Sequence, residues 1–421
     1  MQNINININS EIGKLDGVVI HQPGPEIESM SPENASQALY SDILNRAIAL
    51  PEYLGFSGVL RKYTNVFEVN DLLEETLAND EVKRNLIDTI CVNEKYLGND
   101  ICDLLNLDNN KALAKQLIQG VELRKDNLTK FLGTDKYCLN PLPNFFFTRD
   151  ASFSIGNEVM ISKMKSVVRY RETLIMDTIF KYHPQFRANT VNSVALYDKS
   201  GFGKIEGGDV LVARDDILII GNGERTSTFG IDAIIEHKKT KPGIHHIIVQ
   251  KLPKTPESFI HLDMVFTLLD KNTCMTYEPL VFGGTMYPTT QITIDNHKVT
   301  EVKSVKNILT ALKSLGMELE PILCGGNVDP LLMKREQWHS GANFFTLEPG
   351  KIVGYRRNIN TIEALNKYGF DVVSADDIIN DITTFDDHKR LIITIEGNEL
   401  ARGGGGARCM TMPVSRQKVD W

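Results

Sequence analysis

The chain has 421 residues, of which 42% are hydrophobic and 24% are charged, and this is the composition of a globular protein with one large domain or two to three smaller ones. The formal net charge of −8 provides no basic surface for nucleic acid, and no apolar run is long enough to span a bilayer. The first residues show no signal-peptide pattern, and the six cysteines have neither C-x-x-C nor zinc spacing. We therefore expect free thiols in a reducing cytoplasm.

The N-terminal third is predicted to be a strand followed by helices. A turn and a strand are expected around Leu15 to His21, and helices from about Leu39 to Leu50 and from Phe56 to Leu60. From about Val69 to Phe131 leucine and charge increase and apolar residues recur at helical spacing, which predicts several helices of roughly 10–15 residues and no strand. The two prolines in residues 140–143 end this segment.

A strand–turn–strand pattern then occurs four times, and each copy begins with a small polar or acidic residue. The copies start at Asp150, Asp209, Asp263 and Asn343. Helical stretches follow them, for example Arg171 to Lys181 and Thr361 to Tyr368. The spacing is irregular, roughly 55–80 residues, which is longer than the usual solenoid periods.

The end of the chain carries a thiol behind four consecutive glycines, Gly403 to Gly406 and then Cys409. Ordering such a run is costly unless positive φ or a close backbone approach requires it, and its amides can line a small cavity. The pattern predicts a nucleophile in a tight pocket, and the alternative is a flexible tail with a chance cysteine. Because Met410, Met412 and Val414 alternate like a strand, they favour an ordered fifth unit.

Hairpin-plus-helix units repeated around an axis predict a closed, propeller-like α/β fold whose strand starts face the middle. The leading residues would then converge: Asp150, Glu206 with Asp209, His261 with Asp263, and Cys409. Buried carboxylates need a compensating cation. One thiol and one histidine among scattered acids match no common metal site, whereas a guanidinium presents five N–H donors in a fork that fits two carboxylates.

Each of these residues also has a structural alternative when it is taken alone. The segment Glu206 to Asp209 is compatible with a simple polar turn, and His261 with a structural histidine. Asp150 follows Arg149 and could pair with it. The functional interpretation rests on their equivalent places in the repeat, together with the thiol.

Five motifs in combination resemble the arginine deiminase family. They are Asn144-x-x-Phe147-x-x-Asp150, Arg169-x-x-Glu172, Glu206-Gly207-Gly208-Asp209, His261-Leu262-Asp263, and Gly403–Gly406 followed by Cys409-Met410-Thr411. The resemblance runs from Val18 to the C-terminus. It implies a five-bladed α/β propeller formed by residues 1–70 and 139–421, with a helical insertion at residues 71–138. It also implies a cytoplasmic homodimer or higher homo-oligomer that needs no cofactor or metal and binds neither nucleic acid nor membrane.

The resemblance implies the reaction and the role of each residue. Cys409 would attack the guanidinium carbon of L-arginine, and L-citrulline and ammonia would form by way of a covalent amidino-thioether. Asp150, Asp263 and Glu206 would bind the guanidinium, and His261 would protonate the ammonia and then activate water. Arg169 and Arg225 would hold the substrate carboxylate, and Asn144, Phe147 and Gly404 would line the pocket.

Two places depart from the family pattern. Residues 37–44 are similar to a loop that usually contains Leu-Phe-Asp-Asp, but Tyr40 and Ser41 replace Phe and the first Asp, and Leu39 is the candidate for covering the substrate. Gly404 stands where some relatives have an arginine, for which Arg402 or Arg408 could compensate.

Other functions in the same superfamily stay open at this point. They are hydrolysis of agmatine or a methylated arginine, transfer of the amidino group to an amine, and a catalytically inactive propeller used for binding. Arg169 and Arg225 favour a substrate with a carboxylate, and the complete set of thiol, histidine and acids favours an active enzyme.

Overall fold

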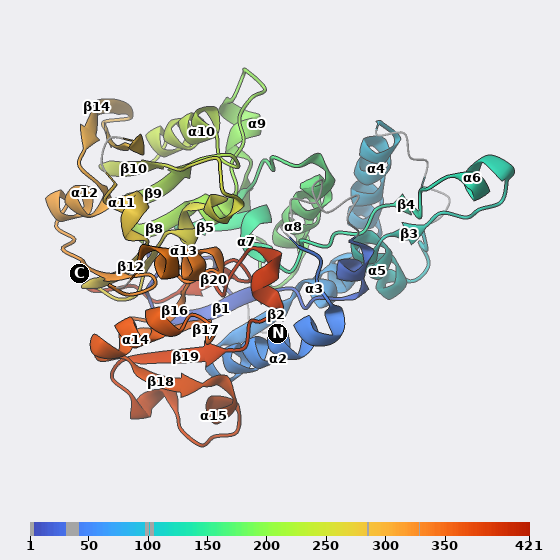
Figure 1. Ribbon diagram of the computed structural model, residues 1–421. Coiled ribbons are helices and arrows are strands. Elements are labelled where there is room, and N and C mark those ends of the chain that lie inside the picture. The colour runs from blue at the N-terminus through green and yellow to red at the C-terminus, as the bar shows by residue number, and fades with distance from the viewer. Residues whose placement is uncertain (1–3, 31–41, 97–100, 102–104, 284–285, 328) are drawn as a thin grey trace.

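The computed structural model describes residues 4–30, 42–96, 101, 105–283, 286–327 and 329–421. Within these ranges the chain forms five sheets of three or more strands, one two-stranded ribbon, and helices packed around them (Figure 1). A search of the same ranges for a helix with the length and hydropathy to cross a membrane finds none. The α-helices are α2 (Arg46–Tyr63), α3 (Val69–Thr76), α4 (Asp80–Tyr96), α5 (Asn110–Gln119), α6 (Leu128–Leu132), α7 (Thr148–Ala151), α8 (Tyr170–Tyr182), α9 (Ser193–Tyr197), α10 (Thr228–Lys239), α11 (Glu278–Val281), α12 (Ile308–Ser314), α13 (Pro330–Trp338), α14 (Ile359–Lys367) and α15 (Ala375–Ile379).

Four of the sheets have the same arrangement. Each begins with a hairpin of two antiparallel strands, and a third strand pairs in parallel with the second strand of that hairpin. These sheets are β5 (Ser152–Ile155), β6 (Glu158–Ile161) and β7 (Asn189–Val191); β8 (Val210–Arg214), β9 (Ile217–Asn222) and β10 (His245–Lys251); β11 (Phe266–Leu268), β12 (Thr273–Thr276) and β15 (Glu320–Leu323); and β16 (Phe345–Glu348), β17 (Lys351–Tyr355) and β19 (Leu391–Ile395). The four hairpins that the sequence predicts are therefore confirmed.

The fifth sheet has the same pairing pattern but takes its strands from both ends of the chain. β20 (Met412–Arg416) runs antiparallel to β1 (Leu15–Ile20), and β1 runs parallel to β2 (Asn65–Glu68). The strand that follows Cys409 is thus the leading strand of this sheet. Two other sheets are wider: β13 (Thr289–Asp295) and β14 (Lys298–Val305) extend the one led by β8, and β18 (Asp371–Ser374) extends the one led by β16.

The inner strands of the sheets are continuous apolar runs with both faces covered, whereas edge strands such as β14 are polar and exposed. In β9 all six residues are buried, as expected for a strand between a helix layer and a neighbouring core. Helix α10 contributes Ile231 and Ile234 to the same apolar cluster as Ile220 of β9. Helical, strand and turn signals therefore agree along this unit.

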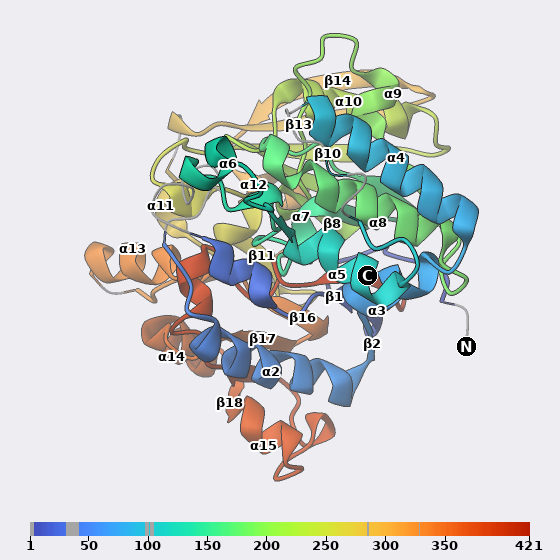
Figure 2. The ribbon, with the colours of Figure 1, turned by 90° about the vertical axis from the view of Figure 1, so that its right-hand side faces the viewer.

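The described residues between Val69 and Phe131 are mainly helical, as predicted. Figure 1 shows α4, α5 and α6 on the right-hand side of the molecule, with α6 at the outer tip, and Figure 2 views the molecule from that side. The apolar side chains of this segment, among them Leu73, Ile90 and Leu117, share one core cluster with Phe180 of α8. The expectation of no strand is wrong in detail, because β3 (Val121–Glu122) pairs with β4 (Tyr137–Leu139).

Two further expectations are corrected. The two helices expected before residue 62 are one helix, α2, which continues through Pro51 because Tyr53, Phe56 and Val59 are completely buried along it and tertiary packing overrides the local signal. Cys91 is disulfide-bonded, so the expectation of free thiols is wrong for this residue, since sequence spacing does not reveal which thiols meet in space. Among the described cysteines, Cys138, Cys274, Cys324 and Cys409 are free.

Candidate active site

The residues that precede three of the leading strands meet in one narrow cavity. Its lining contains most of the residues that the sequence singles out: Asn144, Phe147, Asp150, Arg169, Arg225, Ile260, His261, Gly403, Gly404, Gly405 and Cys409. The space open to the centre of a water molecule is about 20 Å³, which is room for about one water. Entry of a larger ligand therefore requires the lining to move.

Larger surface hollows lie elsewhere, but their chemistry is different. One of about 470 Å³ is lined by residues such as Glu278, Phe282 and Lys367, and another of about 560 Å³ by residues such as Asn5, Asp16 and Asn65. Neither lining contains a thiol or an imidazole. Reactive groups rather than volume therefore identify the narrow cavity as the candidate site.

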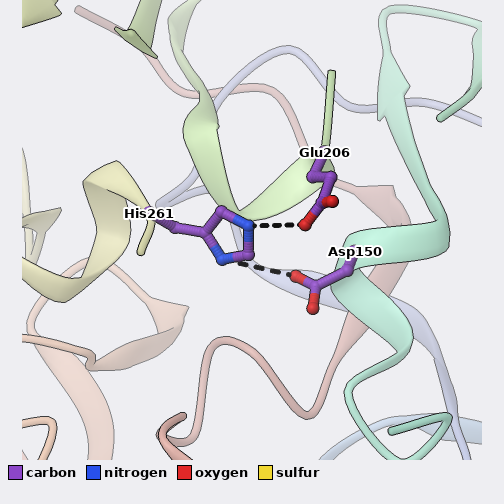
Figure 3. Close-up of side chains that lie close together, drawn as sticks. All are labelled: Asp150, Glu206 and His261. Carbon is purple, nitrogen blue, oxygen red and sulfur yellow. Dashed lines mark hydrogen bonds and ion pairs between the residues drawn. The ribbon is translucent and has the colours of Figure 1, made fainter. Parts of the chain in front are cut away.

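His261 lies between two carboxylates that come from different units (Figure 3). Its Nε2 is 2.9 Å from Oε2 of Glu206, and its Nδ1 is 3.6 Å from Oδ1 of Asp150. Burial alone would lower the pKa of His261, but the charge of Asp150 and the hydrogen bond to Glu206 outweigh it and raise the pKa to about 9. The imidazole is therefore protonated at neutral pH and can act as a general acid.

Cys409 is the thiol of the cavity, and its side chain is 3% exposed. Its Sγ is 3.2 Å from Nδ2 of Asn343 and 3.6 Å from Oδ2 of Asp263. Burial raises the pKa of Cys409 well above the usual range of a thiol, and the charges of Asp263 and Asp150 raise it further. In the unliganded protein the thiol is therefore protonated at neutral pH.

The buried carboxylates of the site are paired with buried arginines. Arg169 Nη1 donates to Asp150 Oδ2 at 2.8 Å, and Arg408 Nη1 donates to Asp263 Oδ2 at 2.8 Å. Arg225 Nη1 donates to Glu206 Oε2 at 3.2 Å. These arginines compensate charges that would otherwise be costly to bury. The alternative pairing of Asp150 with Arg149 is wrong, since the guanidinium of Arg149 donates to Arg408 O and Thr411 Oγ1.

The pairing with arginine occupies one oxygen of each aspartate. Asp150 lines the cavity, whereas Asp263 is not among the lining residues and contacts Cys409, which is. Among the described residues, Oδ1 of Asp150 accepts no hydrogen bond, and Oδ1 of Asp263 contacts only the Cys409 thiol, at 3.8 Å. Two acceptors from different units are therefore available to a planar cation with several N–H donors.

Asp150, Glu206 and His261 also have the ligand types and the proximity for a metal ion, since their ligand atoms lie within 4.8 Å of one another. Arg169 and Arg225 already contact these two carboxylates, and His261 is protonated at neutral pH. A dication would have to displace a proton and face two guanidinium groups, so the donor set does not suit a resident metal.

Glycines in two of the motifs allow the backbone to lie close to neighbouring side chains. A Cβ on Gly405 would lie 2.5 Å from the ring of Phe147 and 3.0 Å from Cβ of Cys409. A Cβ on Gly208 would lie 2.4 Å from Nδ1 of His261. Gly404 has φ of 80°, in the left-handed region that glycine adopts without strain.

Three residues make contacts in the site that the sequence analysis did not predict. Asp209 Oδ1 accepts from the backbone N of Leu262 at 2.9 Å and so fixes the turn that carries His261. Arg408 is completely buried between Asp263 and Glu11, which it reaches at 3.0 Å. Asn343 leads the fourth repeat, and that equivalent position was the signal that could have identified it.

The two departures from the family pattern have different outcomes. Leu39 lies outside the described residues, as do Tyr40 and Ser41. Arg408 contacts Asp263 inside the site, whereas the exposed Arg402 pairs with Asp42 and Glu399.

Comparisons with known proteins agree with this geometry. The family model described as arginine deiminase matches residues 36–416. The chain is 34% identical over 432 residues to the arginine deiminase of Mycoplasma capricolum subsp. capricolum (99% of this chain and 98% of the relative), and 30% identical over 429 residues to that of Oenococcus oeni (99% and 98%).

Solved structures of more distant proteins have a similar fold. The amidinotransferase SxtG of Microseira wollei aligns with a TM-score of 0.53 at 13% identity over 98% of each chain. The N-terminal domain of ArgZ, solved with a covalently bound reaction intermediate, aligns with a TM-score of 0.51 at 14% identity over 95% of this chain and 98% of that one. These likenesses support a shared mixed α/β fold.

Proposed function

The chain belongs to the arginine deiminase family, and we infer from this premise that it hydrolyses L-arginine to L-citrulline and ammonia. The observation that carries the inference is the meeting of Cys409, His261 and Asp150 in one buried cavity. Thiol, imidazole and carboxylates in contact are the groups that covalent hydrolysis of a guanidinium requires.

We propose that the guanidinium binds between Asp150 and Asp263. Oδ1 of each aspartate, which is not bound to an arginine, would accept a hydrogen bond from the substrate, while Arg169 and Arg408 stay bound to the Oδ2 atoms. Delocalised charge makes the guanidinium carbon a poor electrophile, so orientation against the thiol is a large part of catalysis. Glu206, which holds His261 and Arg225, would add a further acceptor.

The bound cation also makes the nucleophile available. Because Asp263 and Asp150 raise the pKa of Cys409, ionisation is unfavourable until a positive substrate offsets their charge. As the substrate binds, the thiol releases its proton to the solvent, and the resulting thiolate forms a C–S bond to the guanidinium carbon. Protonated His261 gives its proton to the departing nitrogen, and ammonia leaves as the C–N bond breaks.

The second half of the reaction reverses the roles. Neutral His261 takes a proton from water, whose oxygen adds to the carbon of the amidino-thioether. The C–S bond breaks, the electron pair returns to the Cys409 sulfur, and the added hydroxyl gives its proton to that sulfur, so that L-citrulline is released and the thiol is restored. Division into two steps replaces one difficult hydrolysis with two easier ones.

The substrate carboxylate is assigned to the arginines of the cavity, with Asn144, Phe147 and Gly404 lining the aliphatic chain. Arg225 is the stronger candidate, because the Nε and Nη2 groups of Arg169 donate to Glu172 and its Nη1 to Asp150. Leu39 is proposed as the residue that covers the substrate.

The proposed architecture and assembly follow from the same premise. The five sheets share one pairing order, and the residues that precede the leading strands of three of them meet in one cavity. This supports a five-bladed propeller of residues 1–70 and 139–421 with residues 71–138 as a helical insertion. We also propose a cytoplasmic location, to be tested by cell fractionation, and a homodimer or higher homo-oligomer. Sedimentation should then give a multiple of the 47.2 kDa chain mass.

The function is tested with the purified protein and L-arginine. Citrulline and ammonia should appear in equal amounts, and the Cys409→Ser variant should form neither while keeping the wild-type circular dichroism spectrum, because a hydroxyl is far less ionised than a thiol. Cys138→Ser, which changes a free buried thiol outside the cavity lining, is the matched control and should stay active. Citrulline formation by Cys409→Ser near the wild-type rate would contradict the covalent mechanism.

A different product would point to another member of the superfamily. If arginine is consumed without citrulline only when an amine acceptor is present, the reaction is amidino transfer. If neither reaction occurs although arginine binds, the protein is a binding module.

A further inference from the structure

Asn343 is a buried amide that joins two units of the fold at the nucleophile. It lies just before β16, at the start of the fourth repeat, and is 1% exposed. Its neighbours are the turn that carries Asp263 and the loop that carries Cys409. It is not part of the cavity lining, so it lies behind the thiol rather than beside the substrate.

The contacts of Asn343 use both ends of the amide. Oδ1 accepts from the backbone N of Arg408 at 2.9 Å and from that of Cys409 at 3.2 Å. Nδ2 donates to the backbone O of Asp263 at 3.1 Å and to Sγ of Cys409 at 3.2 Å. A Cβ on Gly406 would lie 2.8 Å from Cβ of Asn343, so glycine at that position permits the approach.

These partners also fix which end of the amide is which. If oxygen and nitrogen were exchanged, the NH2 group would face the N–H groups of Arg408 and Cys409, and the oxygen would face the carbonyl of Asp263. Both contacts would become repulsive. The orientation that directs an N–H toward Sγ is therefore imposed by backbone groups.

An N–H donor next to Sγ of Cys409 would stabilise the thiolate that the reaction requires. Burial and the charges of Asp263 and Asp150 oppose formation of the thiolate. A hydrogen bond donated to the charged form favours that form. Because Asn343 is neutral, it can stabilise the thiolate without repelling the substrate cation.

We propose that Asn343 is a catalytic residue that donates a hydrogen bond to the Cys409 thiolate before attack and again when the C–S bond breaks. The proposal rests on Cys409 as the nucleophile. The competing interpretation is that Asn343 only anchors the loop through its oxygen.

Two substitutions separate the donor from the anchor. Asn343→Asp keeps an acceptor for the two backbone N–H groups but replaces the donor with a carboxylate, whose own charge also opposes the thiolate, so only the absence of a shift in this variant is decisive. Asn343→Ala removes both the donor and the acceptor without adding a charge. The control is Asn358→Ala, because Asn358 is equally buried at 1% exposure and donates to the backbone O of His339 at 3.0 Å, outside the cavity lining.

The measurement is the pH dependence of alkylation of Cys409 by iodoacetamide without substrate, after subtraction of the Cys409→Ala background. Asn343→Asp and Asn343→Ala should each raise the midpoint by about one pH unit and lower kcat about tenfold or more, with KM for arginine changed less than about threefold. Asn358→Ala should lower the melting temperature and leave the midpoint unchanged.

An unchanged midpoint in Asn343→Asp would overturn the proposal even if Asn343→Ala shifts, because the anchor alone would then explain the effect. If Asn343→Asp does not fold, an unchanged midpoint in Asn343→Ala overturns it instead. The alkylation assay needs no arginine, so its result does not depend on the proposed function. If the protein formed no citrulline but the variants still shifted the pH midpoint of alkylation, the proposed function would fail and the hydrogen bond from Asn343 to the thiolate would still be supported.

Discussion

At the scale of single residues, Asp150 and Asp263 each have one oxygen bound to an arginine of the protein, while the other oxygen lies next to a reactive group, His261 for Asp150 and Cys409 for Asp263. Asp150 is paired with Arg169, and Asp263 with Arg408. The arginines reduce the cost of burying the carboxylates, and the remaining oxygens determine what can bind. Removal of the charge should therefore weaken substrate binding and also release an arginine into the site.

Asp150→Asn and Asp263→Asn should each lower kcat/KM for arginine about a hundredfold or more. The amide preserves shape but presents N–H donors to a guanidinium that needs acceptors, and a charge-assisted bond is worth about 1.5–3 kcal/mol. Asp270→Asn is the control, because it alters a carboxylate–arginine pair with Arg390 outside the cavity lining. If both aspartate variants kept more than about a tenth of the wild-type kcat/KM, the loss of transition-state stabilisation would be below roughly 1.4 kcal/mol. Asp150 and Asp263 would then not be the pair that binds the guanidinium.

We predict that Arg225 determines selectivity for a substrate with a carboxylate. Arginine and agmatine share the guanidinium and the methylene chain, so Arg225→Ala should reduce kcat/KM for arginine at least about tenfold and hardly change it for agmatine. Arg169→Ala should impair both substrates, since Arg169 supports Asp150 and Glu172. Equal proportional losses on the two substrates in Arg225→Ala would mean that the carboxylate is held elsewhere.

At the scale of elements, the reactive groups stand on turns just before the leading strands. Rigid strands fix the direction of each turn. The turns bring together side chains from different sheets, which a single strand could not do. The glycine run before Cys409 is one of the tightly packed turns, since Gly405 lies against Phe147.

Gly405→Ala should reduce activity more than it reduces stability. The new methyl group would lie 2.5 Å from the Phe147 ring and 3.0 Å from Cβ of Cys409, so the ring and the thiol must shift. A displacement of this size at a nucleophile costs about a hundredfold in rate. Gly55→Ala, where nothing lies within 4 Å of the added Cβ, should instead stabilise α2 by about 0.5–1 kcal/mol. Kinetics and thermal melts of both variants check this, and a fully active Gly405→Ala would show that the run needs no close approach.

At the scale of the whole molecule, the two chain ends form one sheet, and buried ion pairs lie beside it. Glu11 bonds to Arg408, and His21, at the end of β1, lies between Glu26 and Glu68 with no exposed surface. Burial alone would lower the pKa of His21, but its hydrogen bonds to Glu26 and Glu68 outweigh it and raise the pKa to about 10. Burial would raise the pKa of Glu11, but Arg408 lowers it to about 2.

Stability should therefore fall at both ends of the pH range. His21 has a folded pKa above the ordinary 6.5, so its contribution is complete below pH 6.5 and is lost as pH rises through about 10. Glu11 has a folded pKa below the ordinary 4.5, so its contribution is present above pH 4.5 and is lost as pH falls toward 2. Melting temperatures from pH 3 to about 10 should be highest near pH 5–6.

One variant can test whether His21 causes the loss of stability at alkaline pH. His21→Gln should be less stable than wild type at pH 6 and should lose less stability between pH 7 and about 10, because the group that titrates is gone. A decrease as steep as that of wild type would show that His21 does not contribute to it.

The amino-acid sequence was sufficient to predict the four hairpins, the helical segment and most of the residues that line the cavity, but not Ile260. Alternation along strands, acidic residues before them and glycines before Cys409 are local signals, and equivalent positions in a repeat predict convergence without coordinates. The tertiary structure decided what depends on the neighbours of a side chain. The pairing of Asp150 with Arg169 rather than Arg149, the continuous α2, the disulfide at Cys91 and the amide of Asn343 against the thiol each join residues whose proximity no local pattern records. Charge compensation and packing act between groups that the fold brings together, and for this reason Asn343 became a candidate only once its contact with Cys409 was known.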